Sequence, residues 1–254
     1  MDRASVIGIL LGMAAVIGGN VFEGGKISSI LQPTAALIVF GGTLGATLLS
    51  FSARDIIRAC TSLKKVFWGR DVNPNDYIVE IVRYADLARK NGLVALEREI
   101  PRIQDPYFRK VMMLAVDRMA AKTLKETIEQ ENITYEEGKR REARVFDTAG
   151  GIAPTIGILG AVLGLIQVME NLSEPSKLGA GIAVAFVATI YGIGSANLLL
   201  IPLAKKLNHR LNKELAMREM ILEGVVGIQT GMNPHYLHER LKGFLEEQET
   251  QIQR

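Results

Sequence analysis

The chain has 254 residues, of which 48% are hydrophobic and 22% are charged, and its formal net charge at pH 7 is +3. A soluble globular protein can have the same apolar share, so composition alone does not separate soluble from membrane proteins. The single cysteine excludes a disulfide framework, and the small net charge argues against nucleic acid as a partner. The distribution of charge along the chain is more informative than its total.

Four windows of the chain contain no charged residue and are long enough to cross a membrane: 4–22, 34–51, 149–169 and 179–203. About 20 helical residues span the hydrocarbon core of a bilayer. Buried helices of soluble proteins are usually shorter or carry polar stripes, although a large buried helical core is the alternative. The first window could also be a signal peptide after Arg3, but no small-residue cleavage pattern follows it. The sequence predicts an all-α membrane protein with four transmembrane helices and a large helical cytoplasmic domain.

The positions of Lys and Arg predict the orientation of these helices. Residues 52–146 contain 19 of them and residues 204–254 contain 8, whereas the short loops 23–33 and 170–178 contain only Lys26 and Lys177. Basic residues mark the cytoplasmic side of a membrane, so both termini are expected in the cytoplasm. The positive charge near the ends of the spans is also expected to contact membrane lipid. The predicted division is 1–51 for the first two transmembrane helices with a short periplasmic loop, 52–147 for a cytoplasmic helical domain, 148–203 for transmembrane helices 3 and 4, and 204–254 for the cytoplasmic C-terminal helices.

The cytoplasmic segments show helical spacing of apolar residues. The pattern predicts helices over 76–100 and 107–132, separated by Pro101 and Pro106, and a charged helix over 133–147 that leads into the third span. The tail is expected to form a helix to about residue 229, a turn at GMNP and a last helix over 236–253. The two cytoplasmic segments are expected to pack on each other.

The predicted spans carry no Asp, Glu, Lys, Arg or His near mid-membrane, and their polar groups are hydroxyls and amides. Proton relays and ion pathways normally need an ionisable group inside the membrane. Either the chain moves no ions, or a partner supplies the titrating group.

Proline and small residues in the spans suggest close packing. Pro154 removes one backbone hydrogen bond near the start of the third span, and Thr155 or water could satisfy the freed carbonyl. Small residues four apart let helices approach closely and associate in lipid. Each span contains such a pair, which suggests a tightly packed, oligomeric bundle: Gly8 with Gly12, Gly41 with Gly45, Gly160 with Gly164, and Gly192 with Ala196.

Motifs of common enzymes are missing from the sequence. It contains no G-x-x-x-x-G-K-[ST], no H-E-x-x-H and no G-x-S-x-G. The histidines all lie in the tail and no third ligand completes a metal site with them. The chain is therefore expected not to be an enzyme and to have no catalytic residue, no metal site and no cofactor.

Five stretches of the chain resemble the A subunits of flagellar-motor stators, the MotA/PomA family. QPTAALIVFGGTLGATLLSF (32–51), GGIAPTIGILGAVLGLIQVM (150–169) and AVAFVATIYGIGSANLLLIPLAKKL (183–207) resemble that family's second, third and fourth spans. ARKNGLVALERE (88–99) is similar to its charged cytoplasmic motif, and GMNPHYLHERLKGFL (231–245) to its tail. The match follows the family order over essentially the whole chain.

This resemblance implies a function in the inner membrane of a bacterium. Five A subunits would surround two MotB-like B subunits, each with one transmembrane helix whose aspartate supplies the titrating group. Ion flow through the complex would drive torque on a FliG-like rotor switch protein. The A subunit would convert ion flux into rotation and perform no covalent chemistry.

The resemblance also implies roles for single residues. Pro154 and Pro202 match the two functional prolines of the family, with Thr155 beside the first in the ion pathway, and Thr189 matches a threonine that faces the B-subunit aspartate. The charged pair that engages the rotor corresponds to Arg89 and Glu97, and Lys90 and Glu99 are neighbouring candidates. Opposite charges on such a surface steer and register a partner more than they add affinity.

The transported ion is predicted from two alanines. Sodium-driven relatives usually carry threonine at the positions of Ala161 and Ala188. A desolvated sodium ion needs several oxygen ligands, whereas a proton needs an acceptor and a water path, so the missing hydroxyls favour protons. Carbonyls near Pro154 could still coordinate sodium, so a sodium-driven stator stays an alternative.

Two further alternatives are a related energiser of outer-membrane transport (ExbB/TolQ-like) and a membrane scaffold without ion flux. The energisers typically have three spans and the opposite N-terminal orientation. The scaffold would tolerate replacement of Pro154 and Thr189.

Overall fold

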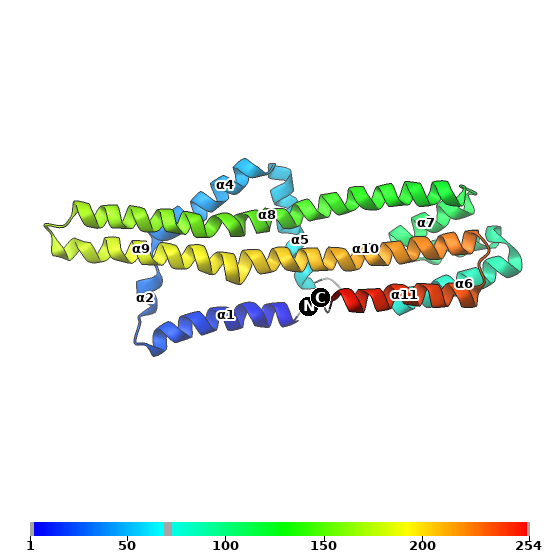
Figure 1. Ribbon diagram of the computed structural model, residues 1–254, viewed down its shortest axis with the longest axis horizontal. Coiled ribbons are helices and arrows are strands. Elements are labelled where there is room, and N and C mark those ends of the chain that lie inside the picture. Colours follow the sequence, from blue (N-terminus) through cyan, green and yellow to red (C-terminus); the bar gives the residue numbers. More distant parts are fainter. Residues whose placement is uncertain (1–2, 69–72, 253–254) are drawn as a thin grey trace. The chain divides into compact units, whose positions relative to one another are not determined.

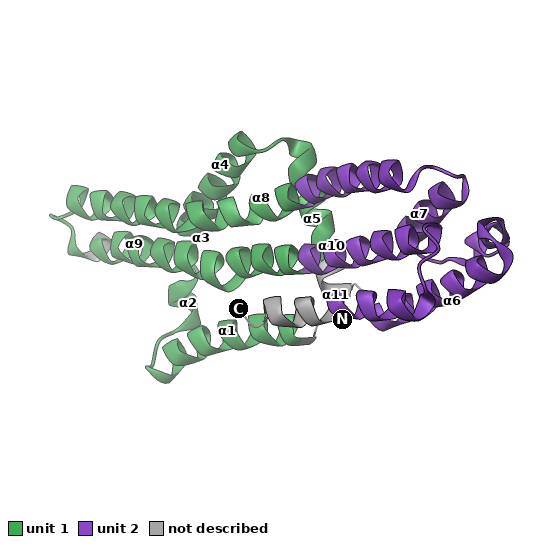
Figure 2. Ribbon diagram, turned by 45° about the vertical axis from the view of Figure 1, so that its right-hand side comes forward, with its two compact units in different colours: residues 1–70, 140–209 green, residues 71–139, 210–254 purple. Residues whose placement is uncertain are grey.

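The computed structural model describes residues 3–68 and 73–252, and over those residues it contains helices and no strand (Figure 1). The chain divides into two compact units (Figure 2). Unit 1 contains residues 1–70 and 140–209, and unit 2 contains residues 71–139 and 210–254. The long helices α8 (Ala121–Glu170) and α10 (Ile201–Gln229) contribute residues to both units.

Unit 1 holds the apolar helices. Four helices of the described chain are long and apolar enough to cross a membrane, which confirms the predicted number of spans. The first is α1 (Arg3–Phe22), and the second runs from α3 (Pro33–Ala36) through a π-helical turn, η1 (Leu37–Gly41), into α4 (Gly42–Ser50). The third is the C-terminal part of α8, and the fourth runs from α9 (Pro175–Ser195) through a second π-helical turn, η4 (Ala196–Leu200), into α10. The short α2 (Ile27–Ile30) lies between the first two spans, and α5 (Ala53–Trp68) follows the second.

Local sequence explains where several of these helices begin. Pro33 and Pro175 occupy the first turns of α3 and α9, where a missing backbone N–H costs nothing. α8 is unbroken over 50 residues, from a charged segment into an apolar one. The prediction that a charged helix leads into the third span is therefore confirmed. The residues at which the chain enters the membrane stay a prediction.

A seam of small residues joins α8 to α9 in unit 1. A methyl group added at Gly164 would lie 2.7 Å from the backbone nitrogen of Ala185, and one added at Gly157 would lie 2.9 Å from the carbonyl oxygen of Ala188. A methyl group at Gly160 would lie 2.7 Å from the Cβ of Ala188. The two backbones are thus nearly in contact, as glycine allows between helices in lipid.

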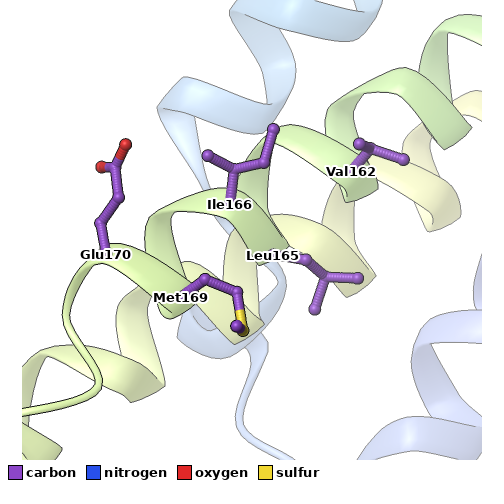
Figure 3. A pocket seen from close by; sticks show the side chains of 5 residues that line it. All are labelled: Val162, Leu165, Ile166, Met169 and Glu170. Atoms are coloured by element: carbon purple, nitrogen blue, oxygen red, sulfur yellow. The ribbon is translucent and has the colours of Figure 1, made fainter.

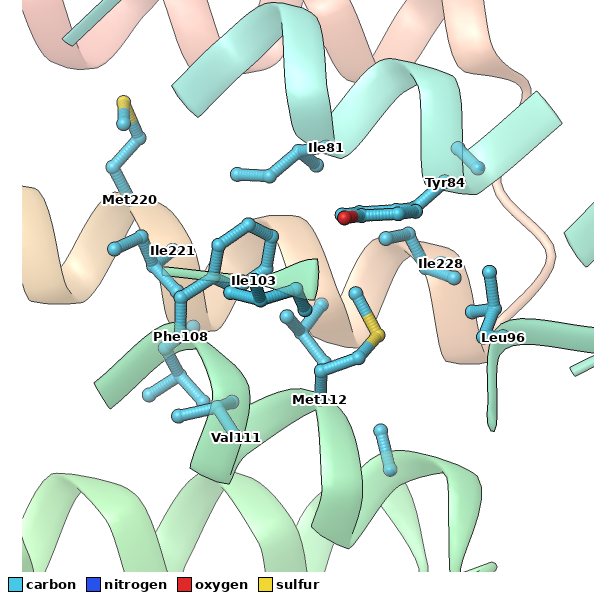
Figure 4. Packing of buried hydrophobic residues seen from close by; sticks show 14 of the residues in the cluster. Ile81, Tyr84, Leu96, Ile103, Phe108, Val111, Met112, Met220, Ile221 and Ile228 are labelled. Carbon is cyan, nitrogen blue, oxygen red and sulfur yellow. The ribbon is translucent and has the colours of Figure 1, made fainter. Parts of the chain in front are cut away.

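Unit 2 has a core of large apolar side chains. Its remaining elements are α6 (Pro74–Asn91), two 3₁₀ turns, η2 (Leu93–Arg98) and η3 (Ile100–Arg102), α7 (Pro106–Val116) and α11 (Pro234–Ile252). The core collects residues from α6, α7, α8, α10 and α11, including Ile81, Tyr84, Phe108, Met112 and Ile221 (Figure 4). The two cytoplasmic segments therefore pack on each other, as predicted.

Two of the predicted cytoplasmic helices are shorter than the apolar pattern suggests. The helix expected over 76–100 ends at Asn91, because Gly92 has φ 81° and ψ 163°, a conformation essentially restricted to glycine. The helix expected over 107–132 is interrupted after Val116, and Arg118 has a positive φ of 61° in the turn before α8. The predicted end of the tail helix at residue 229 and the last helix after GMNP are confirmed.

Candidate functional site

The seam between α8 and α9 places Pro154 and Thr189 within about one helical turn of each other. A methyl group added at Gly192 would lie 2.6 Å from the carbonyl oxygen of Ala153 and 3.2 Å from the Cα of Pro154. One added at Gly157 would lie 3.5 Å from the Cα of Thr189. Two ion-pathway candidates that are far apart in sequence are thus neighbours across the closest approach of the two helices.

The hydroxyl groups of this region bond back to their own helices. The Thr189 hydroxyl donates to the carbonyl of Ala185 at 3.2 Å, and the Thr155 hydroxyl donates to the carbonyl of Ile152 at 2.7 Å. The carbonyl freed by Pro154 belongs to Gly150, four residues before it. The suggestion that Thr155 satisfies this carbonyl is wrong, because its side chain reaches back three residues and not five.

Helix α8 presents two different faces. Ala161 follows Pro154 by seven residues and is half-buried on the face that carries Gly157 and Gly164. Thr155 is exposed on the opposite side and shares its face with Val162, seven residues later. This second face continues into an open, apolar hollow of about 410 Å³ (Figure 3). Its lining residues are Val162, Leu165, Ile166, Met169 and Glu170.

Pro202 lies just after the π-helical turn η4, and its side chain is exposed. The neighbouring Ile201 packs at 2.7 Å from the position of a methyl group added at Gly150. Gly150 precedes Pro154 by about one helical turn. The two prolines therefore lie about one turn apart along the paired helices. The π-helical turn itself had no recognisable signal in the sequence.

Tyr191 forms contacts that the sequence analysis did not predict. Its hydroxyl donates to the carbonyl of Ile30 at 2.6 Å and accepts from the backbone N–H of Gln32 at 3.3 Å. Its ring stacks on Phe40, with the ring centroids 5.7 Å apart. Tyr191 thus ties the loop before the second span to α9. A tyrosine in an otherwise apolar window was the signal that could have identified it.

The charged motif of unit 2 lies at the end of α6 and in η2. Arg89 and Lys90 occupy the last turn of α6, where the helix dipole favours cations, and Glu97 lies in the 3₁₀ turn. All three side chains are exposed, and none forms an ion pair with another residue in the described part of the chain. They are thus available to a partner.

Glu99 has a different environment. Its carboxylate lies 2.8 Å from Arg102 and 3.8 Å from Arg83, and its side chain is only 18% exposed. Arg83 in turn lies over the ring of Tyr84. These contacts connect the loop after α6 to α6 itself, so Glu99 is occupied by intramolecular contacts.

Three tyrosines of unit 2 are held in their protonated form. Burial, followed by a hydrogen bond to Glu80, raises the pKa of Tyr84 to about 12. Burial is also the main cause that raises the pKa of Tyr107 to about 12. The pKa of Tyr77 is raised by burial and by its hydrogen bond to Asp105. The Tyr77 hydroxyl thereby joins α6 to the residue that caps α7, and the Tyr107 hydroxyl joins α7 to α10 by donating to the carbonyl of Arg218 at 3.2 Å.

Comparison with protein families matches both parts of the chain. Residues 99–220 match the MotA/TolQ/ExbB proton channel family, and residues 6–92 match the family described as motility protein A N-terminal. The chain belongs to the motility protein A branch of the MotA/TolQ/ExbB proton channel family. It is therefore a multi-pass membrane protein, and the predicted family is confirmed.

Individual relatives match over nearly their full length. Motility protein A of Bacillus subtilis (strain 168) is 33% identical over 96% of this chain and 91% of the relative. Chemotaxis protein PomA of Vibrio alginolyticus is 33% identical over 97% of this chain and 96% of the relative. These motility relatives do not favour the alternative of an outer-membrane energiser.

Solved structures show the same fold. A structure of C. jejuni MotAB has a TM-score of 0.90 and 31% identity, covering 96% of each chain. The flagellar MotAB stator complex from Bacillus subtilis has a TM-score of 0.88 and 33% identity, covering 94% of each chain. The helical membrane fold predicted from the sequence is therefore confirmed.

Proposed function

We propose that this chain is the A subunit of a flagellar stator, which couples ion flow across the bacterial inner membrane to torque on the rotor. The observation that carries the proposal is the likeness to two MotAB structures over at least 94% of the chain. The assembly would contain several copies of this chain, five by the family resemblance, around a MotB-like B subunit. The distribution of Lys and Arg supports a cytoplasmic location for both termini.

The proposed ion pathway uses the third and fourth spans. These spans carry no Asp, Glu, Lys, Arg or His near mid-membrane, so the B subunit would supply the titrating aspartate. Pro154 and Thr189, both half-buried at the edge of the seam, would line the path of that carboxylate, and Pro202 would lie about one turn away. The exposed face of α8 that begins at Thr155 and continues into the apolar hollow would receive the B helix, because it is apolar and its side chains are exposed within the described part of the chain.

Protons are the proposed ion. Ala161 and Ala188 lack the hydroxyls that a dehydrated sodium ion would need, and Ala188 is fully buried against Gly160. A larger, hydroxylated side chain at position 188 would have to displace α8. The seam therefore offers few oxygen ligands and favours a proton path through the B-subunit carboxylate.

The proposed rotor surface consists of Arg89, Lys90 and Glu97. These charges are exposed and carry both signs, which suits steering and registration against a charged partner. Glu99 would instead hold the loop in place through Arg83 and Arg102.

Replacement of Pro154 tests the ion-pathway role. We expect Pro154→Leu to abolish swimming and proton flux while the chain still inserts, as judged by membrane fractionation. Pro175→Leu is the matched control, because Pro175 lies in the first turn of α9 and away from the seam's proline. Normal swimming in the Pro154 variant would reject the pathway assignment.

The choice of ion needs a separate measurement. Swimming speed should be independent of external sodium and should collapse with a protonophore. A speed that rises with sodium at a constant proton gradient would overturn the proton proposal and support the sodium-driven alternative.

A further inference from the structure

Helix α5 begins directly after the second span. Only Phe51 and Ser52 separate Ser50, the last residue of α4, from Ala53. Phe51 is extended, with φ −133° and ψ 152°, and three extended residues cover at most about 11 Å. The start of α5 therefore lies close to the level at which the second span ends.

The packing of α5 places it at the ends of two more spans. Its buried Ala59 forms a cluster with Val145 and Phe146 of α8 and with Ala204 of α10. Residues 145 and 146 lie just before the third predicted span at 149, and residue 204 just after the fourth at 203. Three of the four spans thus leave the apolar region at the level of α5.

The outward face of α5 combines three cations with one exposed aliphatic side chain. Arg54, Arg58 and Lys64 are exposed, and Ile57 is 64% exposed among them. Among the side chains that the structure describes, which leave out residues 1–3, 65–72, 176–177 and 245–254, none forms an ion pair or a side-chain hydrogen bond with these three cations. The nearby Asp55 is occupied at the start of the helix, where it accepts from the Ser52 hydroxyl at 2.7 Å.

We propose that this outward face of α5 is a binding site for anionic phospholipid headgroups. A basic face with an apolar residue on a helix at the membrane surface is the pattern of interfacial helices that prefer anionic lipids. Guanidinium groups bind phosphate oxygens in a planar, bidentate geometry, and Ile57 would enter the acyl boundary. The connection to three span ends favours lipid over a soluble partner. The inference rests on the four spans alone and not on the proposed ion coupling.

Cys60, the only cysteine of the chain, allows a direct test on the full-length protein. It is exposed on α5, so a fluorophore attached there reports on this helix. The labelled chain is reconstituted in vesicles of phosphatidylcholine and phosphatidylglycerol, with bromine on the acyl chains of one lipid at a time. We expect brominated phosphatidylglycerol to quench more than brominated phosphatidylcholine at equal mole fraction. We also expect 1 M salt to remove the difference, because it shortens the screening length to about 3 Å.

A pair of charge-removing variants identifies the responsible side chains. Arg54→Gln with Arg58→Gln should lower the ratio of the two lipid binding constants by up to about 25-fold, since each basic residue near an anionic surface contributes a factor of about five. Lys122→Gln with Lys242→Gln removes the same charge from exposed sites of unit 2 and should leave the ratio unchanged.

If the variants fail to fold, the quenching and salt series on the chain without substitutions still test the proposal. Three results of that series would overturn it. Equal quenching by both lipids would show an interfacial helix without anionic preference. Quenching by aqueous iodide but by neither lipid would place α5 away from the membrane. Protection from lipid and from iodide alike would show that protein covers this face. Because none of these readouts measures ion flux, a stator can fail this test and still conduct.

Discussion

Unit 1 and unit 2 are both helical, but they bury different side chains. The largest almost wholly buried side chains of the described chain all belong to unit 2, and they include Tyr84, Phe108 and Met112. Unit 1 buries mainly alanine, valine and glycine between its helices and leaves large apolar side chains such as Leu49 and Phe186 exposed. In water the hydrophobic effect drives large side chains inward, whereas in lipid it supplies no such force between helices. The contrast shows that each unit is built for a different solvent.

The largest effect on stability is expected from a substitution in the core of unit 2. Phe108 is fully buried and contacts the rings of Tyr77 and Tyr84. Phe108→Ala should cost about 3–5 kcal/mol of unfolding free energy, because the cavity cannot close. Hydrogen exchange should show loss of protection in peptides of unit 2 and not in the spans. Val79→Ala, at an exposed site of α6, should change stability by at most about 0.5 kcal/mol. Equal loss in both units would mean that they unfold together.

The next largest effect on stability is expected from a substitution in the seam between α8 and α9 of unit 1. A methyl group at Gly192 would collide with backbone atoms of α8, whereas one at Gly194 meets nothing within 4 Å. Gly192→Ala should cost about 1–3 kcal/mol through overpacking and lower the detergent midpoint of unfolding, and Gly194→Ala in the same helix should not. The same midpoint for both variants would contradict close backbone packing.

A pH series sharpens the comparison, because the tyrosines with raised pKa values lie in unit 2. The folded state raises the pKa of Tyr84 from 10.0 to about 12, so the unfolded chain ionises first as the pH rises. The stabilisation is complete below pH 10 and is lost between pH 10 and 12. Melting temperature should therefore fall over this range, and less steeply in Tyr84→Phe. Identical slopes in the two proteins would show that other groups control alkaline unfolding.

The smallest effect on stability is expected from the charged surface. Arg89→Glu and Glu97→Lys change exposed side chains that form no ion pair among the described residues, so stability should change by at most about 0.5 kcal/mol. Torque on a tethered cell should fall while ion conduction is retained. Lys122→Glu, at another exposed site, is the control and should leave torque unchanged. Loss of conduction in the Arg89 or Glu97 variants would instead place these residues in the ion pathway.

Much of the fold was predictable because its signals are local. A long charge-free window can place its side chains in lipid and pair its backbone hydrogen-bonding groups internally when it forms a helix. The basic residues next to each window are visible in the sequence regardless of how the helices pack. The end of α6 was harder, because the apolar spacing continues past Gly92 and only the backbone conformation of this glycine stops the helix. The next helix, α7, begins where the side chain of Asp105 caps it by accepting a hydrogen bond from the backbone N–H of Phe108 at 2.8 Å.

The candidate site was predictable in its members but not in its arrangement. Resemblance named Pro154, Thr189 and Glu99, yet it did not distinguish the seam face of α8 from the exposed face that carries Thr155, nor show that Glu99 is held by two arginines. The sequence by itself determined four spans and their charge asymmetry, since each is a property of composition along one segment, and it determined the family through the order of motifs along the chain. Only the tertiary structure decided which small residues meet across α8 and α9 and that α5 presents exposed cations at the span ends. Those facts depend on which faces of distant segments come together, and helical periodicity alone does not specify that.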